Sequence, residues 1–147
     1  MPIVPVNYLA VVACAVAAMI LGFLWYGPLF GKMWMKLSGM PDDAMERAKS
    51  DPKMKAQMMR SYVFMFVGSL VMAWVLAFSI TFSSTYMHVT GLNAGLMSAF
   101  FNWLGFIAPV TLSGVLWEMK PWKLWILNNA YYLVLLGIMG VILSMLM

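Results

Sequence analysis

Three asparagines fall well inside long apolar segments, where a polar side chain needs a specific partner. Asn102 lies in the middle of one such segment, and Asn128 and Asn129 lie one to two helical turns into the next. A carboxamide both donates and accepts hydrogen bonds, so at membrane depth it joins helices, for about 0.5–2 kcal/mol, or holds a polar ligand. We expect helix-joining roles, and these residues are also the candidate intramembrane polar site.

The other reactive side chains do not form a catalytic set. Glu118 is the only acid in the second half of the sequence, and the nearby Lys120 and Lys123 predict a local ion pair. His88 is the only histidine and Cys14 the only cysteine, which leaves neither a catalytic triad nor a set of zinc ligands. The seventeen methionines occur in every apolar segment, as adaptable packing residues do. We therefore predict no enzyme activity, no metal site and no cofactor.

The apolar segments are long enough to cross a membrane. Apolar residues make up 64% of the 147 residues and charged residues 10%, whereas soluble domains carry about 25% charged residues. A spanning helix needs about 20 apolar residues, and four stretches qualify, at 8–30, 62–82, 92–117 and 122–147. We predict an all-α, integral membrane four-helix bundle that forms a single domain over residues 1–147. Pro109 should bend or loosen the third helix.

The distribution of basic residues predicts the orientation of these helices. Seven Lys and Arg residues lie between the first and second spans and two between the third and fourth, with none near either terminus. Because Lys and Arg stay preferentially on the cytoplasmic side, we expect both termini outside and the loop 31–61 in the cytoplasm. The net charge of +4 then reflects orientation and anionic lipid, and not nucleic acid.

The first loop carries two signals for the start of a helix. Pro41 is followed by Asp42 and Asp43, an arrangement that favours a helix N-terminus and predicts a short cytoplasmic helix. Asp51 and Pro52 match an N-cap followed by proline at the first helical position. We expect the helix that begins there to continue unbroken into the second span.

A spaced repeat relates the first span to the third. The triplet Leu-Gly-Phe at 21–23 recurs at 104–106. At the same separation Leu29, Gly31 and Trp34 match Leu112, Gly114 and Trp117. The repeat predicts a duplicated helical hairpin, helices 1–2 and 3–4, related by a pseudo-twofold axis along the membrane normal, with the first and third spans central and equivalent.

Small residues follow one face of the third span. Gly91, Gly95 and Gly105 are spaced with Ser98 and Asn102 at intervals of three or four residues. Such residues let helix backbones approach closely in lipid. We expect this face to pack within the bundle, with contact between copies of the chain as the alternative. Further small-residue positions are Gly27, Gly31, Gly137 and Gly140.

Two stretches at the predicted cytoplasmic ends of the spans have unusual compositions. The first reads WYGPLFGK at 25–32 and continues through Trp34, and the second reads LWEMKPWKLW at 116–125 and continues through Asn128 and Tyr131. Both stretches resemble signatures of the domain-of-unknown-function 1761 family of small bacterial membrane proteins, and the resemblance covers essentially the whole chain. It implies a four-helix protein of the bacterial inner membrane, without an established activity and without catalytic residues to carry over.

We predict that these two signatures together form the functional surface, since both lie at the ends that the repeat relates. The first signature contributes Trp25, Tyr26, Gly27, Pro28, Gly31 and Trp34. The second signature contributes Trp117, Glu118, Lys120, Pro121 and Trp122.

The sequence leaves three kinds of function open. We favour a non-catalytic module that lies in the lipid bilayer and associates with itself or serves as an accessory subunit of a larger membrane complex. The alternative is a small-solute transporter or channel. It would work as a homo-oligomer, because a single chain of 147 residues is short for enclosing a transport pathway. A weaker alternative is the binding of a lipid, quinone or pigment at the tryptophan-rich end.

Overall fold

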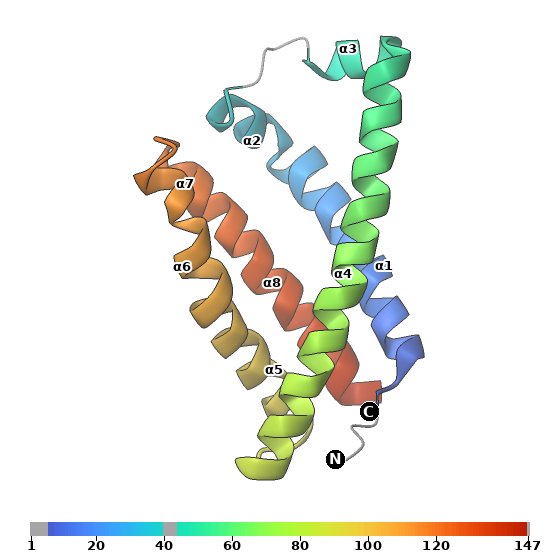
Figure 1. Cartoon of the computed structure of the whole chain (residues 1–147), viewed down its shortest axis with the longest axis vertical. Helices are drawn as coiled ribbons and strands as arrows, with labels where there is room; N and C mark the ends of the chain where they lie inside the picture. The colour runs from blue at the N-terminus through green and yellow to red at the C-terminus, as the bar shows by residue number, and fades with distance from the viewer. Residues whose placement is uncertain (1–5, 40–43, 147) are drawn as a thin grey trace.

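The computed structural model describes residues 6–39 and 44–146, and within these ranges every regular element is helical (Figure 1). Four helical segments are long and apolar enough to cross a membrane: Tyr8–Leu29, Pro52–Tyr86, Gly91–Leu116 and Trp122–Leu146. They confirm the predicted all-α architecture of four spanning helices. Most large apolar side chains on their outer faces are exposed, which fits a multi-pass membrane protein surrounded by lipid.

The first span changes its helical geometry before it ends. Helix α1 (Tyr8–Leu24) begins at Asn7, whose Oδ1 accepts hydrogen bonds from the backbone N–H groups of Leu9 and Ala10. A π-helical turn, η1 (Trp25–Leu29), and a short helix, α2 (Gly31–Leu37), follow. Pro28 lies inside η1 and lacks the N–H that a regular α-helix needs. The first signature therefore starts where the regular helix stops.

The second span is the longest helix. It is α4 (Pro52–Tyr86), preceded by the short loop helix α3 (Ala44–Ser50). Asp51 is the N-cap of α4, with its Oδ1 3.0 Å from the backbone nitrogen of Lys53, so the predicted start and the unbroken course are confirmed. Pro41, Asp42 and Asp43 lie outside the described residues. The 35 residues of α4 measure about 50 Å, well beyond a hydrocarbon core of about 30 Å.

The third span is irregular, as Pro109 predicted. It consists of α5 (Gly91–Asn102), a second π-helical turn, η2 (Trp103–Ile107), and the short helices α6 (Ala108–Thr111) and α7 (Ser113–Leu116). Pro109 is near the start of α6, and the π-helical turn directly precedes it. The fourth span is the single helix α8 (Trp122–Leu146).

The two ends of the bundle differ in charge. Figure 1 shows α2, α3 and α7 at one end, and both termini with the α4–α5 turn at the other. All nine Lys and Arg residues belong to α2, α3, the beginning of α4, or the α7–α8 turn and the residues just after it. We call these the basic end and the termini end.

The buried core lies in the half of the bundle near the termini end. It is built largely from small residues, which bring α1, α4, α5 and α8 close together. Its members include Ala10, Cys14, Ala15, Ala73, Ala77, Ala94, Ala99, Leu135, Met139 and Leu143. Cys14 is fully buried beside the carbonyl oxygen of Met139, as expected of a packing thiol. Toward the basic end, residues 61–68 of α4 are exposed or only partly buried, and α4 separates from the other helices (Figure 1).

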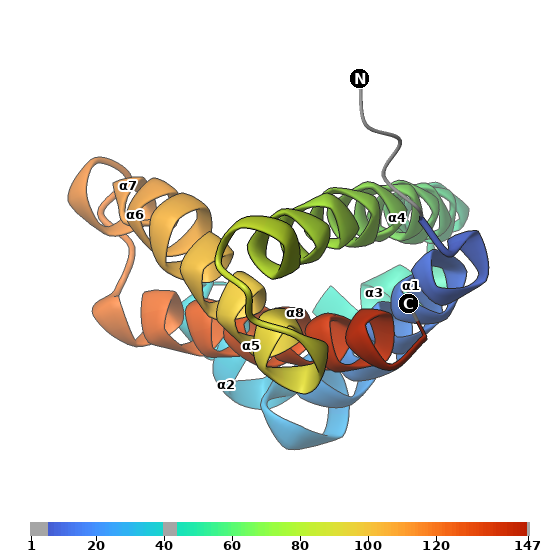
Figure 2. The same cartoon turned by 90° about the horizontal axis from the view of Figure 1, so that it is seen from below.

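The fourth span, and not the first and third, is central. Helix α8 contacts α1, α4 and α5, and 39% of its most apolar segment is buried, against 11% for the third span. Helices α1 and α5 lie on opposite sides of the bundle (Figures 1 and 2). The prediction that spans one and three are central is therefore wrong, because the repeat identified similar segments without showing which face of each is buried. The duplicated hairpin itself stays a prediction.

A very close contact between backbones joins α5 to α8. A methyl group placed on Gly95 would overlap the carbonyl group of Gly140, and one on Gly140 would lie 2.5 Å from the carbonyl oxygen of Gly95. Gly95 therefore packs against α8 within the bundle. Gly91 and Gly105 show no such contact, since no other part of the described chain lies within 4 Å of a methyl group placed at either position. Gly91 instead has a φ of +64°, a backbone conformation that glycine adopts readily.

We predict that Gly95→Ala destabilises the bundle, because the added methyl group forces α5 and α8 apart. Overpacking of this kind costs about 1–3 kcal/mol. The measurement is the thermal unfolding midpoint of the purified protein in mild detergent. Gly137→Ala in α8 is the matched control, because no other part of the described chain lies within 4 Å of a methyl group placed there, and it should leave the midpoint unchanged or raise it slightly. Equal midpoints for the two variants would contradict the proposed contact.

Candidate functional site

The first signature packs against α8 through an aromatic cluster. The ring centroid of Tyr26 lies 5.5 Å from that of Trp34 and 5.1 Å from that of Tyr131. Trp25 lies 4.7 Å from Phe30 and 6.1 Å from Tyr131. The cluster comprises Trp25, Tyr26, Phe30, Trp34, Tyr131 and Tyr132. Tilted and edge-to-face aromatic pairs of this kind add to the stability of packing, so they hold η1 and α2 on the surface of α8.

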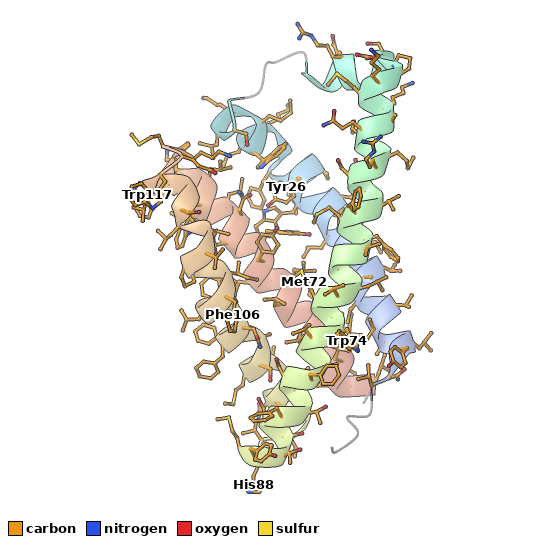
Figure 3. All side chains as sticks on the ribbon, viewed as in Figure 1. Tyr26, Met72, Trp74, His88, Phe106 and Trp117 are labelled. Atoms are coloured by element: carbon orange, nitrogen blue, oxygen red, sulfur yellow. The ribbon has the colours of Figure 1, made fainter. Side chains whose placement is uncertain are left out.

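Hydrogen bonds fix two of the tyrosines in this cluster. The hydroxyl of Tyr26 donates to Oδ1 of Asn128 over 2.7 Å, and Figure 3 shows Tyr26 among the helices in the half of the bundle toward the basic end. The hydroxyl of Tyr131 donates to the carbonyl oxygen of Ala18 at 3.5 Å. The indole nitrogen of Trp25 is buried and has no acceptor among the described residues. Asn128 therefore joins the first and fourth spans.

Asn129 joins the third and fourth spans. Its side chain is 2% exposed, and its Nδ2 donates to Oγ1 of Thr111 and to the carbonyl oxygen of Trp125, both at 2.9 Å. The indole N–H of Trp103 donates to the backbone oxygen of Asn129 at 2.9 Å. These bonds tie α8 to the irregular part of the third span, where the π-helical turn and Pro109 interrupt regular backbone hydrogen bonding.

Asn102 lies apart from the other two asparagines. Its Nδ2 donates to the carbonyl oxygen of Ser98, one turn earlier in the same helix, at 2.7 Å. Its Oδ1 has no hydrogen bond within the described part of the chain. Ser98 in turn lies 3.1 Å, oxygen to oxygen, from Ser83 of α4. The three candidate polar residues thus occupy three different contacts and do not converge on one site.

Asn102 lines a groove between α4 and α5 with a volume of about 570 Å³, which we call the polar groove. Phe82 and Phe101 border it and are 64% and 58% exposed, so the groove opens to the outside of the bundle. Its lining residues are Phe78, Ser79, Phe82, Ser83, Met87, Met97, Ser98, Phe101 and Asn102. None of them carries a formal charge.

The second signature forms the exposed turn between α7 and α8 at the basic end. Trp117 and Met119 are more than four-fifths exposed, and Figure 3 shows Trp117 at the edge of the molecule. Lys120 Nζ lies 3.8 Å from Glu118 Oε2, which confirms the predicted ion pair. Both signatures lie at the same end of the bundle, but the first is packed against α8 whereas the turn of the second projects outward.

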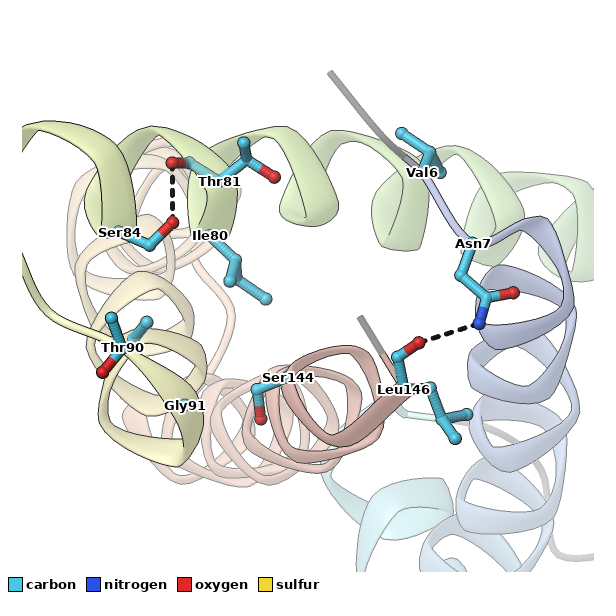
Figure 4. A pocket seen from close by; sticks show the side chains of 10 residues that line it. Val6, Asn7, Ile80, Thr81, Ser84, Thr90, Gly91, Ser144 and Leu146 are labelled. Carbon is cyan, nitrogen blue, oxygen red and sulfur yellow. Dashed lines mark hydrogen bonds between the residues drawn. The ribbon is translucent and has the colours of Figure 1, made fainter. Parts of the chain in front are cut away.

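A second pocket opens at the termini end among all four spans (Figure 4). It has a volume of about 550 Å³ and is lined by hydroxyl groups of Thr81, Ser84, Thr90 and Ser144. Asn7 closes one side through a hydrogen bond from its Nδ2 to the carbonyl oxygen of Leu146 at 2.9 Å. We call this the termini pocket. Within the described ranges, no three His, Cys, Asp or Glu side chains come together as a metal site would require.

Comparison with known proteins identifies the family. A family model described as "Protein of unknown function (DUF1761)" matches residues 9–144. The chain belongs to this family. The matched range of the DUF1761 family encloses both signatures, the aromatic cluster and the polar groove, so the resemblance inferred from the two signatures is confirmed. No curated protein and no solved structure was found to match the chain.

The sequence pointed to Asn128, Asn129 and Tyr26 of this DUF1761 protein, but not to Thr111, which bonds to Asn129. Ser83 and Tyr132, which contact Ser98 and Tyr131, also look like ordinary members of apolar helices, and only the packing of the helices shows what they contact. One signal was present: Tyr131 and Tyr132 follow Asn128 by about one helical turn, so they share its face of α8.

We predict that Tyr26→Phe lowers the stability of the bundle by about 0.5–1.5 kcal/mol, because Asn128 loses its hydrogen bond. Tyr132→Phe provides a control in the same cluster, since no described residue hydrogen-bonds to the Tyr132 hydroxyl. The measurement is unfolding in detergent followed by tryptophan fluorescence. If both variants unfold at the same midpoint as the unmodified protein, the Tyr26–Asn128 bond does not hold η1 against α8.

Proposed function

We propose that this protein is a non-catalytic membrane module that assembles laterally in the bilayer through its α4–α5 face. The observation that supports this is the polar groove, which opens to the outside of the bundle and is lined by Asn102 and Ser79 together with the Ser83–Ser98 pair. A helix face that contacts only lipid acyl chains gives such polar groups no hydrogen-bonding partner.

The depth of Asn102 makes its environment apolar. Asn102 is the last of the 12 residues of α5, in a third span of 26 residues. At 1.5 Å per residue it lies roughly 18 Å from the start of the span, close to the middle of a hydrocarbon core of about 30 Å. An amide oxygen without a hydrogen bond is unfavourable there, by about 2–7 kcal/mol in transfer measurements. A neighbouring polypeptide that supplies a donor removes this cost.

We also propose that the protein lies in the bacterial inner membrane with the termini end outside. Support comes from the charge difference between the two ends, since every Lys and Arg of the sequence lies at the basic end. Fusion of alkaline phosphatase or of green fluorescent protein to the C-terminus tests this orientation. We expect an active phosphatase and a dark fluorescent protein, and the opposite pair would show that the basic end faces outward.

Lateral assembly predicts a mass above that of one chain, 16.5 kDa, when the protein is extracted into nanodiscs with its native lipids. Asn102→Leu should shift the protein toward the monomer, because the groove loses its carboxamide. Asn93→Leu is the matched control, the same change at an exposed position of the same helix outside the groove. A monomer without co-purifying protein, for the unmodified chain, would contradict the proposal.

Transport of a small neutral solute is the second candidate function, and the termini pocket is the observation that favours it. The pocket lies among the four spans and offers hydroxyl groups without a formal charge on any described lining residue. Beneath it, however, the axis of the bundle is filled by buried apolar residues such as Leu143, Met139 and Ala77. Uptake of glycerol or urea into proteoliposomes above that of protein-free vesicles would favour transport over the assembly module.

A further inference from the structure

We propose that the partner in the polar groove is a second copy of this chain, inserted in the same orientation. The α5 helices of the two copies pack side by side, and their Asn102 carboxamides pair across a twofold axis along the membrane normal. This inference rests on the proposed assembly function and names the partner at that same face.

In such a pair, each free donor of one Asn102 side chain has a free acceptor on the other. A carboxamide offers two N–H donors and one carbonyl acceptor. One N–H of Asn102 is used by the carbonyl oxygen of Ser98, at 2.7 Å, which leaves the second N–H and Oδ1 for a partner. Two Asn102 side chains that face each other each give one hydrogen bond and each receive one. A twofold axis produces this reciprocity without any other residue.

The depth of Asn102 also favours a second copy over an unrelated helix. Copies with the same orientation place Asn102 at the same level of the bilayer, because the same residues set the level of each chain. An unrelated helix would need its own polar residue at that level. Since no lining residue of the groove carries a formal charge, two copies meet there without electrostatic repulsion.

The shape of the face allows close approach. Gly105 follows Asn102 by three residues, and no other part of the described chain lies within 4 Å of a methyl group placed on it. A glycine that packs against nothing inside the bundle leaves room for a neighbouring backbone, as small residues do between membrane helices. Phe101, next to Asn102, is 58% exposed and can enter the groove of the other copy beside Phe82.

Cysteine cross-linking in native membranes tests the partner and the face together. The background is Cys14→Ala, which removes the only cysteine, a buried one. Single cysteines are then introduced as Gly105→Cys and Phe101→Cys on the proposed interface, and as Val16→Cys on exposed α1 as a control. Mild oxidation should join the first two into disulfide-linked dimers of twice the chain mass and leave the Val16→Cys protein monomeric.

The role of Asn102 is tested in the Gly105→Cys protein. Asn102→Leu removes both reciprocal hydrogen bonds, about 1–2 kcal/mol in total, so the dissociation constant of the dimer should rise roughly five- to thirty-fold. Asn102→Gln keeps the carboxamide and should retain part of the cross-linking. The thermal unfolding midpoint of each variant shows whether the bundle itself remains folded.

The possible outcomes separate this inference from the function on which it rests. Dimers that form through each of the two interface cysteines, and that weaken with Asn102→Leu, support the inference and the proposed function together. A heavier species that contains another protein, without cross-linking between copies, overturns the inference and leaves lateral assembly in place. Cross-linking through Val16→Cys alone overturns the proposed face. A monomer by native mass, without any cross-linking, overturns both.

Discussion

A polar group in the hydrocarbon of a bilayer has no water to bond, so it must find its partner in protein. Asn128 and Asn129 of this bundle obey that constraint. Asn129 bonds to Thr111 and Trp125, and Asn128 accepts from Tyr26. Each of these bonds joins two spans or steadies one of them. Asn102 at mid-depth satisfies only part of its hydrogen-bonding capacity within the described chain, and the proposed association between copies follows from that difference.

The packing of the helices differs between the two ends of the molecule. Near the termini, small residues and the Gly95–Gly140 contact bring the backbones together and make a dense core. Near the basic end α4 separates from the other helices, and the aromatic cluster takes the place of small-residue packing between the first span and α8. The tight half fixes the relative positions of α4 and α5 and therefore forms the groove. The open half presents the two family signatures.

Much of this arrangement could be predicted from the sequence because it depends on local physical properties. Apolar length located the four spans to within a few residues at most ends, and Asp51 with Pro52 located the true start of α4, well before its apolar segment. Pro109 predicted the irregular geometry of the third span. The two signatures were sufficient to recognise the family.

The remaining features depend on which face of each helix is buried, and local sequence does not determine that in a membrane. Residues on lipid-facing and core-facing surfaces are similarly apolar, so nothing distinguished Gly95, which touches α8, from Gly105, which touches no other described part of the chain. For the same reason the central place of α8 and the separation of Asn102 from Asn128 and Asn129 appeared only in the folded chain.

A density map of the protein extracted with its surrounding lipid is the sharpest test of the pairing between copies, because it shows what lies against α4 and α5 without prior choice of a partner. We expect a second bundle related by a twofold axis, with one Asn102 facing the other. Lipid acyl chains alone along the polar groove, on every particle, would contradict it.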